Sequence, residues 1–282
     1  MPRLFSVVIA GLVLCGHLVG HAAERPSSPA AQLVAEPRVL VIAHRGDSLI
    51  APENTLPAFE SAVRAGADMV ELDYLHSSDG VPFVIHDYTL DRTTNAVELF
   101  GGTKIKASSK SLADLLKLDA GSWFSPKFKG TPLPTLEQSL DEIQKGSVTL
   151  IERKGGDAEA CIELLRKKGL IDKVVVQAFD WHYLEDCHRL APELQLGALG
   201  NGELEAKQFA AIKRTGASAI GWDYKDLDAQ KIDAIHDAGY KAWGWTIDNP
   251  ADAQRLVDAG LDGIITNDPA KMRQFAPVAN AQ

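Results

Sequence analysis

A short phrase recurs four times along this chain, and it limits the possible folds more than any other feature. The first copy is Arg64–Asp73, with the sequence RAGADMVELD, and related copies stand at 214–223, 237–246 and 258–266. In each copy the end of a helical pattern meets a glycine suited to a left-handed helix cap, and a short apolar run follows. The phrase therefore predicts a fold that repeats helix, turn and strand.

Other strand candidates are short, almost continuous apolar runs, at Val39–Ala43, Pro82–His86, Val148–Glu152, Val174–Ala178 and Gln195–Leu199. Parallel strands that are buried on both faces have this composition. Their alternation with helices predicts either a barrel or a doubly wound sheet. Because no glycine-rich nucleotide motif follows the first strand, a (β/α)₈ TIM barrel is the favoured fold class.

The strand count predicts that the barrel is irregular. Nine candidates are one too many for a (β/α)₈ barrel. The runs Met69–Asp73 and Pro82–His86 are separated only by Tyr74–Val81, which is too short for a helix, so the irregularity is expected there. Residues 88–134 are long for a loop and are interpreted as an insertion over the active face, with a short helix at Leu112–Leu118.

The N-terminal residues have the pattern of a secretory signal. Arg3 precedes an apolar run, Leu4–Val19, which is short for a membrane span. An uncleaved anchor is the alternative. A lipoprotein anchor at Cys15 is disfavoured because Leu14 stands where a small residue is expected. We therefore expect an exported protein, periplasmic or secreted, without a stable membrane span after cleavage.

These patterns divide the chain into a signal peptide at 1–23, a flexible lead-in at 24–37 that is rich in Pro, Ser and Ala, and a barrel domain at 38–282. Cleavage would leave two cysteines, Cys161 and Cys187. Export permits a disulfide between them, but both stand in predicted helices, which favours two buried thiols.

The charge balance limits the partners. The formal net charge is −9 at pH 7, and no basic stretch stands out. Nucleic acid is therefore not an expected partner, and no protein partner is indicated. An anionic small molecule would need a local cluster of cations.

Three carboxylates are predicted to meet at one end of the barrel. Glu71 and Asp73 stand two apart at the end of one predicted strand, so their side chains share a face, and Glu152 ends another strand. Three such acids would repel one another unless a cation joined them. Oxygen ligands without cysteine suit Ca²⁺ or Mg²⁺ better than Zn²⁺. Simple salt bridges, such as Glu152 with Lys154, are the alternative.

Two histidines and two cations complete the candidate site. His44 and His86 each end an apolar strand candidate and suit a general acid and base around one reacting centre. Arg45 and Lys154 offer a planar fork and a point charge for phosphate oxygens. Together with a metal ion, these groups favour phosphoryl transfer over chemistry at a carbonyl.

The order of these motifs resembles the glycerophosphodiester phosphodiesterase family from about residue 38 onward. The matching motifs are His44-Arg-Gly, Pro52-Glu-Asn-Thr55, Glu71-Leu-Asp73, His86-Asp87, Leu90-Asp-Arg-Thr-Thr94, Glu152 with Lys154, Gln177 with Phe179, Trp245-Thr246 and Ile265-Thr-Asn-Asp268.

The resemblance implies an irregular barrel of the phospholipase-C-like phosphodiesterase type. It also implies metal-dependent hydrolysis of glycerophosphodiesters to sn-glycerol 3-phosphate and an alcohol, with one Ca²⁺ or Mg²⁺. By position it implies His44 and His86 as the catalytic pair, Glu71, Asp73 and Glu152 as metal ligands, and Arg45, Lys154 and Trp245 as substrate-binding residues. The role of Glu53 and Asn54 stays open, since Asn54 or Thr55 could cap the next helix.

Three alternatives remain at this point. A phosphodiesterase of the same lineage that acts on lysophospholipids or sphingomyelin would use the same residues. An amidohydrolase-type metalloenzyme would favour His-x-His on the first strand, where this chain has His44-Arg-Gly. A periplasmic binding protein would hold phosphodiesters without cleaving them, and the histidine pair argues against it.

Overall fold

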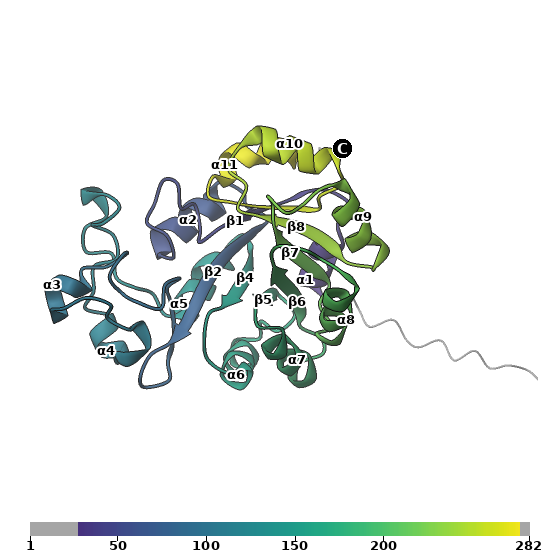
Figure 1. The fold of residues 1–282 in the computed structure, drawn as a ribbon. Coiled ribbons are helices and arrows are strands. Elements are labelled where there is room, and N and C mark those ends of the chain that lie inside the picture. The colour runs from purple at the N-terminus through teal and green to yellow at the C-terminus, as the bar shows by residue number, and fades with distance from the viewer. Residues whose placement is uncertain (1–27, 277–282) are drawn as a thin grey trace, which may run out of the picture.

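The computed structural model describes residues 28–276, so the predicted signal peptide at 1–23 lies outside the described residues. Parallel strands form a closed wall of eight strands, which confirms the predicted barrel (Figure 1). They are β1 (Leu40–Ala43), β2 (Met69–His76), β4 (Val148–Arg153), β5 (Val174–Ala178), β6 (Gln195–Gly200), β7 (Ala219–Asp223), β8 (Lys241–Trp245) and β9 (Gly263–Thr266). The sheet closes where β1 pairs with both β9 and β2.

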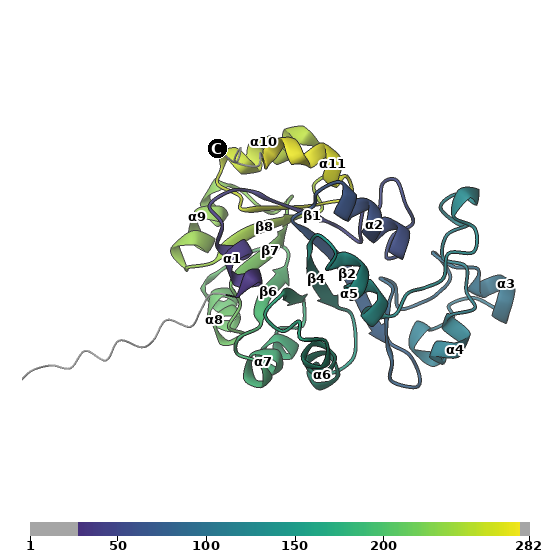
Figure 2. The same cartoon turned by 180° about the vertical axis from the view of Figure 1, so that it is seen from behind.

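Helices between the strands form an outer layer around this wall (Figure 1 and Figure 2). The layer holds α2 (Leu56–Arg64), α5 (Leu136–Ile143), α6 (Ala158–Lys168), α7 (Trp181–Leu190), α8 (Ala206–Arg214), α9 (Ala229–Asp237), α10 (Pro250–Asp258) and α11 (Pro269–Met272). The predicted helix caps are confirmed at Gly66 and Gly216, whose φ angles of 72° and 67° suit glycine. Most of the core lies between the strands and this layer.

The ninth strand, β3 (Pro82–Val84), is the irregularity, at the place where it was predicted. It runs antiparallel to β2, with Val84 opposite Tyr74. Strand β2 continues past its acids to His76, so the prediction that it ends at Asp73 was wrong. The chain then turns, and β3 returns along β2, where the amide of Ile85 donates to the carbonyl of Asp73 at 3.0 Å.

The insertion packs on this hairpin. It contains α3 (Ala96–Phe100), α4 (Leu112–Leu115) and 3₁₀ helices at Ala107–Ser109 and Pro126–Phe128. Its apolar side chains form a separate cluster with Phe83 and Ile85, so it extends beside α2 and β2 and does not lie over the barrel (Figure 1). The predicted position over the active face is therefore corrected, while α4 confirms a shorter form of the predicted helix.

Part of the expected flexible lead-in is ordered. Residues Pro29–Ala35 form α1, which begins where the Ser28 hydroxyl accepts a hydrogen bond from the Ala31 amide at 3.1 Å. Ala30 and Val34 are buried against the first residues of several strands. The helix lies in front of the strands in Figure 2 and behind them in Figure 1. Burial of this apolar face, which the composition did not reveal, explains the correction.

Cys161 on α6 and Cys187 on α7 are both buried and free, which confirms the thiols that the sequence favoured. Among residues 28–276, none of the helices combines the length and the apolar character that a membrane crossing requires.

Candidate active site

The three predicted carboxylates meet because β2 and β4 are neighbours in a parallel register. Asp73 lies directly opposite Glu152 across the two strands, and Glu71 lies on the same face two residues earlier. Glu71 and Asp73 are 0% exposed and Glu152 is 7% exposed. One oxygen from each carboxylate lies within 4.8 Å of the others. The structure thus gathers all three acids in one buried cluster.

This cluster has the donor set of a divalent cation site. Glu71 Oε1 and Asp73 Oδ1 are buried and have no hydrogen-bond partner. Burial and the charges of Asp73 and Glu152 raise the pKa of Glu71 well above its ordinary value. Burial and Asp73 raise the pKa of Glu152 to about 7. Free carboxylate oxygens that repel one another in a dry site fit a hard cation such as Ca²⁺ or Mg²⁺.

Neighbouring groups hold the acids in place. The Asn54 side-chain amide donates to Asp73 Oδ2 at 2.8 Å, and its oxygen accepts from the Asp73 backbone amide at 3.1 Å. The backbone amide of Arg45 donates to Glu71 Oε2 at 2.7 Å. Asn54 therefore positions a candidate metal ligand and does not cap α2. Thr55 occupies the cap position, but its hydroxyl donates to the Pro52 carbonyl.

The two predicted cations border the acids. Lys154 Nζ lies 2.8 Å from Glu152 Oε1 and 3.8 Å from Asp73 Oδ1, and Arg45 Nε lies 3.5 Å from Asp73 Oδ2. The salt bridge considered from the sequence is thus present within the site. Burial disfavours the charge of Lys154, but Glu152 and Asp73 raise its pKa above the ordinary value. Both cations stay charged at the cavity wall.

His44 follows β1, and its tautomer is set by Asn267. The Asn267 amide donates to Asp248 Oδ2 at 2.7 Å, so its oxygen faces His44 Nδ1 at 2.8 Å. The Ser48 hydroxyl donates to the same oxygen. Nδ1 of His44 therefore carries the proton, and Nε2 keeps its lone pair. Burial and the charge of Arg45 lower the pKa of His44 to about 4.

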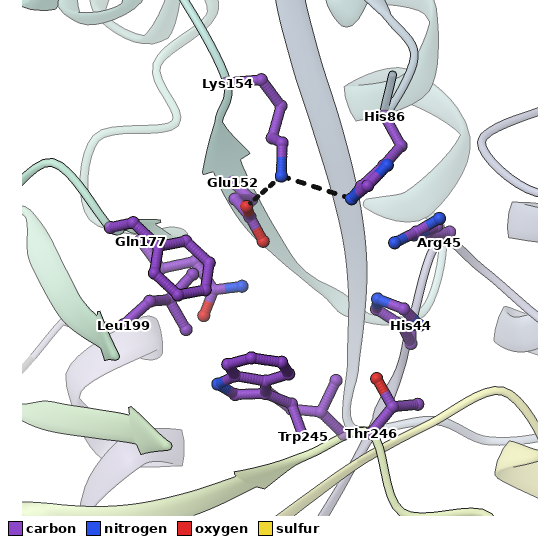
Figure 3. Close-up of a pocket in the computed structure, with 11 residues that line it drawn as sticks. His44, Arg45, His86, Glu152, Lys154, Gln177, Leu199, Trp245 and Thr246 are labelled. Carbon is purple, nitrogen blue, oxygen red and sulfur yellow. Dashed lines mark hydrogen bonds and ion pairs between the residues drawn. The ribbon is translucent and has the colours of Figure 1, made fainter. Parts of the chain in front are cut away.

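His86 reaches the site by another route. It does not end a barrel strand, because β3 stops at Val84 and belongs to the hairpin. The antiparallel return of β3 brings it back to the level of the acids, where Nε2 lies 3.3 Å from Lys154 Nζ. Nδ1 lies 2.7 Å from Asp87 Oδ1, a carboxylate acceptor. In Figure 3, Arg45 lies between the two histidines.

A cavity of about 170 Å³ opens between these groups and an apolar wall. The lining residues are His44, Arg45, His86, Glu152, Lys154, Gln177, Phe179, Leu199, Trp245, Thr246 and Ile265. Gln177, Leu199 and Trp245 lie across from His86 and Arg45 in Figure 3. The rings of Phe179 and Trp245 meet edge to face with centroids 5.6 Å apart. Glu71 and Asp73 are linked to the lining residues through Arg45, whose backbone amide contacts Glu71 and whose side chain contacts Asp73.

Sequence reasoning missed the residues that orient the histidines and cations. Asp87, Arg92 and Asn267 stand in motifs that the sequence singled out, but no role was assigned to them. For Asp87 and Asn267, the position directly after a strand candidate was the available signal, whereas Arg92 stands in the following loop and had none. That position did not show which partner each side chain would meet, because His44 and Asn267 are 223 residues apart.

Groups of this kind suit the cleavage of a phosphate ester, and β/α-barrels carry them at the carboxyl ends of their strands. The fold and the site define a phosphoric diester hydrolase of the barrel class. Comparison with known proteins identifies the member of that class: the chain belongs to the glycerophosphoryl diester phosphodiesterase family, whose model matches residues 44–271.

Two curated relatives and one solved structure illustrate the similarity. A glycerophosphodiester phosphodiesterase of Bacillus subtilis is 35% identical over 295 residues, covering 95% of each chain. One from Caldanaerobacter subterraneus is 36% identical, covering 82% of this chain and 95% of the relative. The structure of an Oleispira antarctica phosphodiesterase in complex with the product sn-glycerol-3-phosphate has a TM-score of 0.77 at 29% identity, covering 83% and 95%.

Proposed function

We propose that this chain hydrolyses glycerophosphodiesters to sn-glycerol 3-phosphate and an alcohol, using one divalent cation. The observation that carries the proposal is the convergence of two histidines, Arg45 and Lys154 on a cavity beside three buried carboxylates. Family membership and the named activity of the relatives support the choice of substrate.

Glu71, Asp73 and Glu152 would hold the cation. When bound, Ca²⁺ or Mg²⁺ supplies positive charge next to the phosphoryl oxygens. The guanidinium of Arg45 and the ammonium of Lys154 bind the remaining oxygens of the diester and balance its charge. Both side chains line the cavity and are mostly buried, which strengthens these contacts.

His44 is the general base. Its low pKa keeps it neutral at physiological pH, and its Nδ1 proton on Asn267 leaves Nε2 ready to accept a proton. The attacking oxygen, from water or from the vicinal hydroxyl of the glycerol, forms a bond to phosphorus and gives its proton to His44 Nε2. Attack by the hydroxyl yields a cyclic phosphate that water then opens.

His86 is the general acid. Asp87 Oδ1 accepts the Nδ1 proton at 2.7 Å and fixes the ring, so that Nε2 faces the cavity beside Lys154. As the bond from phosphorus to the ester oxygen breaks, His86 Nε2 gives its proton to the leaving alkoxide. Proton exchange with solvent then resets both histidines.

The apolar wall holds the organic part of the substrate. Gln177 is 1% exposed, and its side-chain oxygen has no hydrogen-bond partner. Its amide group binds a hydroxyl of the glycerol. Trp245 and Phe179 pack against the carbon chain beside it.

A release assay tests the activity. The purified chain is incubated with several glycerophosphodiesters, a lysophospholipid and sphingomyelin, first with a chelator and then with Ca²⁺ or Mg²⁺ restored. Metal-dependent formation of sn-glycerol 3-phosphate from the small diesters is expected. The proposal fails if no metal restores the product or if only the lipids are cleaved.

The two histidine roles are separated by the leaving group. His86→Ala should lose about 10²- to 10⁴-fold in kcat on glycerophosphocholine but much less on a diester of p-nitrophenol, which leaves without a proton. His44→Ala should lose activity on both substrates. The opposite pattern would exchange the roles, and rapid quenching for a cyclic product distinguishes the two attacking oxygens.

Export is the last part of the proposal. It rests on the sequence of the first residues, where Arg3 precedes the apolar run Leu4–Val19. N-terminal sequencing of the protein from an exported fraction should find a start near residue 24. Recovery of the full-length chain with the membrane would favour an uncleaved anchor.

A further inference from the structure

Arg92 stands at the start of the insertion and joins two segments of the active site. Its guanidinium donates four hydrogen bonds to two carboxylates. Nε and Nη2 lie 2.6 and 3.0 Å from the oxygens of Asp87, and Nη1 and Nη2 each lie 2.8 Å from an oxygen of Glu53. The planar guanidinium thus makes two hydrogen bonds to each of the two carboxylates.

Each of these acids in turn holds a residue that lines the cavity. Asp87 lies 2.7 Å from Nδ1 of His86, and Glu53 accepts a hydrogen bond from Nη1 of Arg45 at 2.8 Å. Glu53 precedes α2, whereas Asp87 follows β3, so the two come from separate loops. Arg92 connects these loops and, through them, the candidate acid and the candidate phosphate ligand.

We propose that Arg92 is a positioning residue that sets His86 and Arg45 relative to each other for phosphodiester cleavage. The inference rests on the proposed function and adds a role for the insertion. Only an arginine can satisfy both acids, since its fork offers five donors in one plane, whereas a lysine is a point charge.

The exposure of Arg92 argues against a role in stability alone. Its side chain is 45% exposed, and exposed ion pairs contribute little to folding. The two acids are less exposed, at 13% for Glu53 and 26% for Asp87. Arg92 holds the two negative charges next to the cavity. Among the described residues that line the cavity, Arg92 itself is absent. Such a group affects turnover more than unfolding.

Steady-state kinetics of Arg92→Ala and Arg92→Lys test the proposal. Both variants should fold with a melting temperature close to that of the unchanged protein. We expect kcat/KM to fall about 10- to 100-fold in Arg92→Ala. Arg214→Ala is the matched control, because Arg214 is also exposed and its ion pair with Glu185 joins two outer helices, α8 and α7. Its kinetics should not change.

Chemical rescue distinguishes positioning from a structural effect. Guanidinium ion, at a concentration too low to denature, should restore part of the lost kcat to Arg92→Ala and leave Arg214→Ala unchanged. In a double-mutant cycle, Arg92→Ala and Asp87→Asn should together cost less than the sum of their separate losses, because both remove the contact between Arg92 and Asp87. The proposal is wrong if Arg92→Ala keeps kcat/KM within about twofold, or if the losses are fully additive and guanidinium restores nothing.

A binding measurement keeps this result separate from the proposed activity. Arg92→Ala should also bind sn-glycerol 3-phosphate more weakly by calorimetry, since Glu53, without its two hydrogen bonds from Arg92, holds Arg45 less firmly. If the unchanged protein binds this ligand but cleaves no diester, the proposed function fails. The role of Arg92 in positioning Arg45 is then tested by comparing the affinity of the two proteins for the ligand. Equal affinity of both proteins would then refute the role.

Discussion

Asp73 on β2 and Glu152 on β4 lie directly opposite each other in the parallel register of the barrel, with both carboxylates buried. Two acids in this relation repel each other unless a cation or a proton lies between them. Burial and the charge of Asp73 raise the pKa of Glu152 to about 7 in the metal-free protein, although Lys154, 2.8 Å away, opposes the shift. Protons and metal ions are therefore expected to compete for the same oxygens.

This competition makes metal affinity depend on pH. Below about pH 7 Glu152 mostly carries a proton, which must leave before a cation binds, and the pKa of Glu71 is raised as well. The affinity for Ca²⁺ or Mg²⁺ should fall at least about tenfold per pH unit below pH 7 and change less above it. Calorimetry at pH 6 and pH 8, in buffers of different ionisation enthalpy, measures both affinity and proton release. Equal affinity at both pH values would contradict the prediction.

Glu71→Gln should stabilise the metal-free protein while abolishing turnover. The folded-state pKa of Glu71 lies above its ordinary value, so its contribution to stability is lost as pH rises above about 4.5. At pH 8 the variant should gain about 1–3 kcal/mol in the free energy of unfolding, and at pH 5 the gain should shrink. Urea unfolding with a chelator present checks this.

The control for that measurement is Glu60→Gln on α2. The Glu60 side chain is 59% exposed and pairs with Arg64, so its loss should change stability by less than about 0.5 kcal/mol at either pH. If both variants gained a similar free energy of unfolding, the cause would be the change in net charge and not the loss of a carboxylate from the buried cluster.

Asn267→Ala should lower kcat by about 10- to 100-fold with little change in melting temperature. Without the amide oxygen, His44 is free to place its proton on Nε2, which removes the base from the cavity. Asn249→Ala is a useful comparison, because Asn249 caps α10 through a bond to the Ala251 amide. That variant should lose about 1 kcal/mol of stability and keep its kcat. A normal kcat in Asn267→Ala would show that the tautomer is set elsewhere.

Val34→Ala in α1 tests the ordered part of the lead-in. Val34 is 4% exposed and packs against the first residues of the barrel strands. Its truncation should cost about 2 kcal/mol of unfolding free energy. Activity should not change, because the helix lies at the amino ends of the strands and the cavity lies at their carboxyl ends. An unchanged melting temperature would mean that packing of α1 against the strands does not stabilise the barrel.

The sequence alone determined the features that depend on local periodicity and turn chemistry. Gly66 and its counterparts marked the helix ends, and the spacing of Glu71 and Asp73 placed both acids on one face because strand side chains alternate. The order of the motifs was also enough to indicate the family, because it needs no knowledge of contacts.

Tertiary structure decided the rest, because those features depend on residues that are distant in the chain. The return of β3 along β2, and not the end of a barrel strand, brings His86 to the acids. The hydrogen bonds between His44 and Asn267 and between Arg92 and Glu53 form only when separate loops meet. Polar side chains in loops have many possible partners, and only the closed barrel selects one of them.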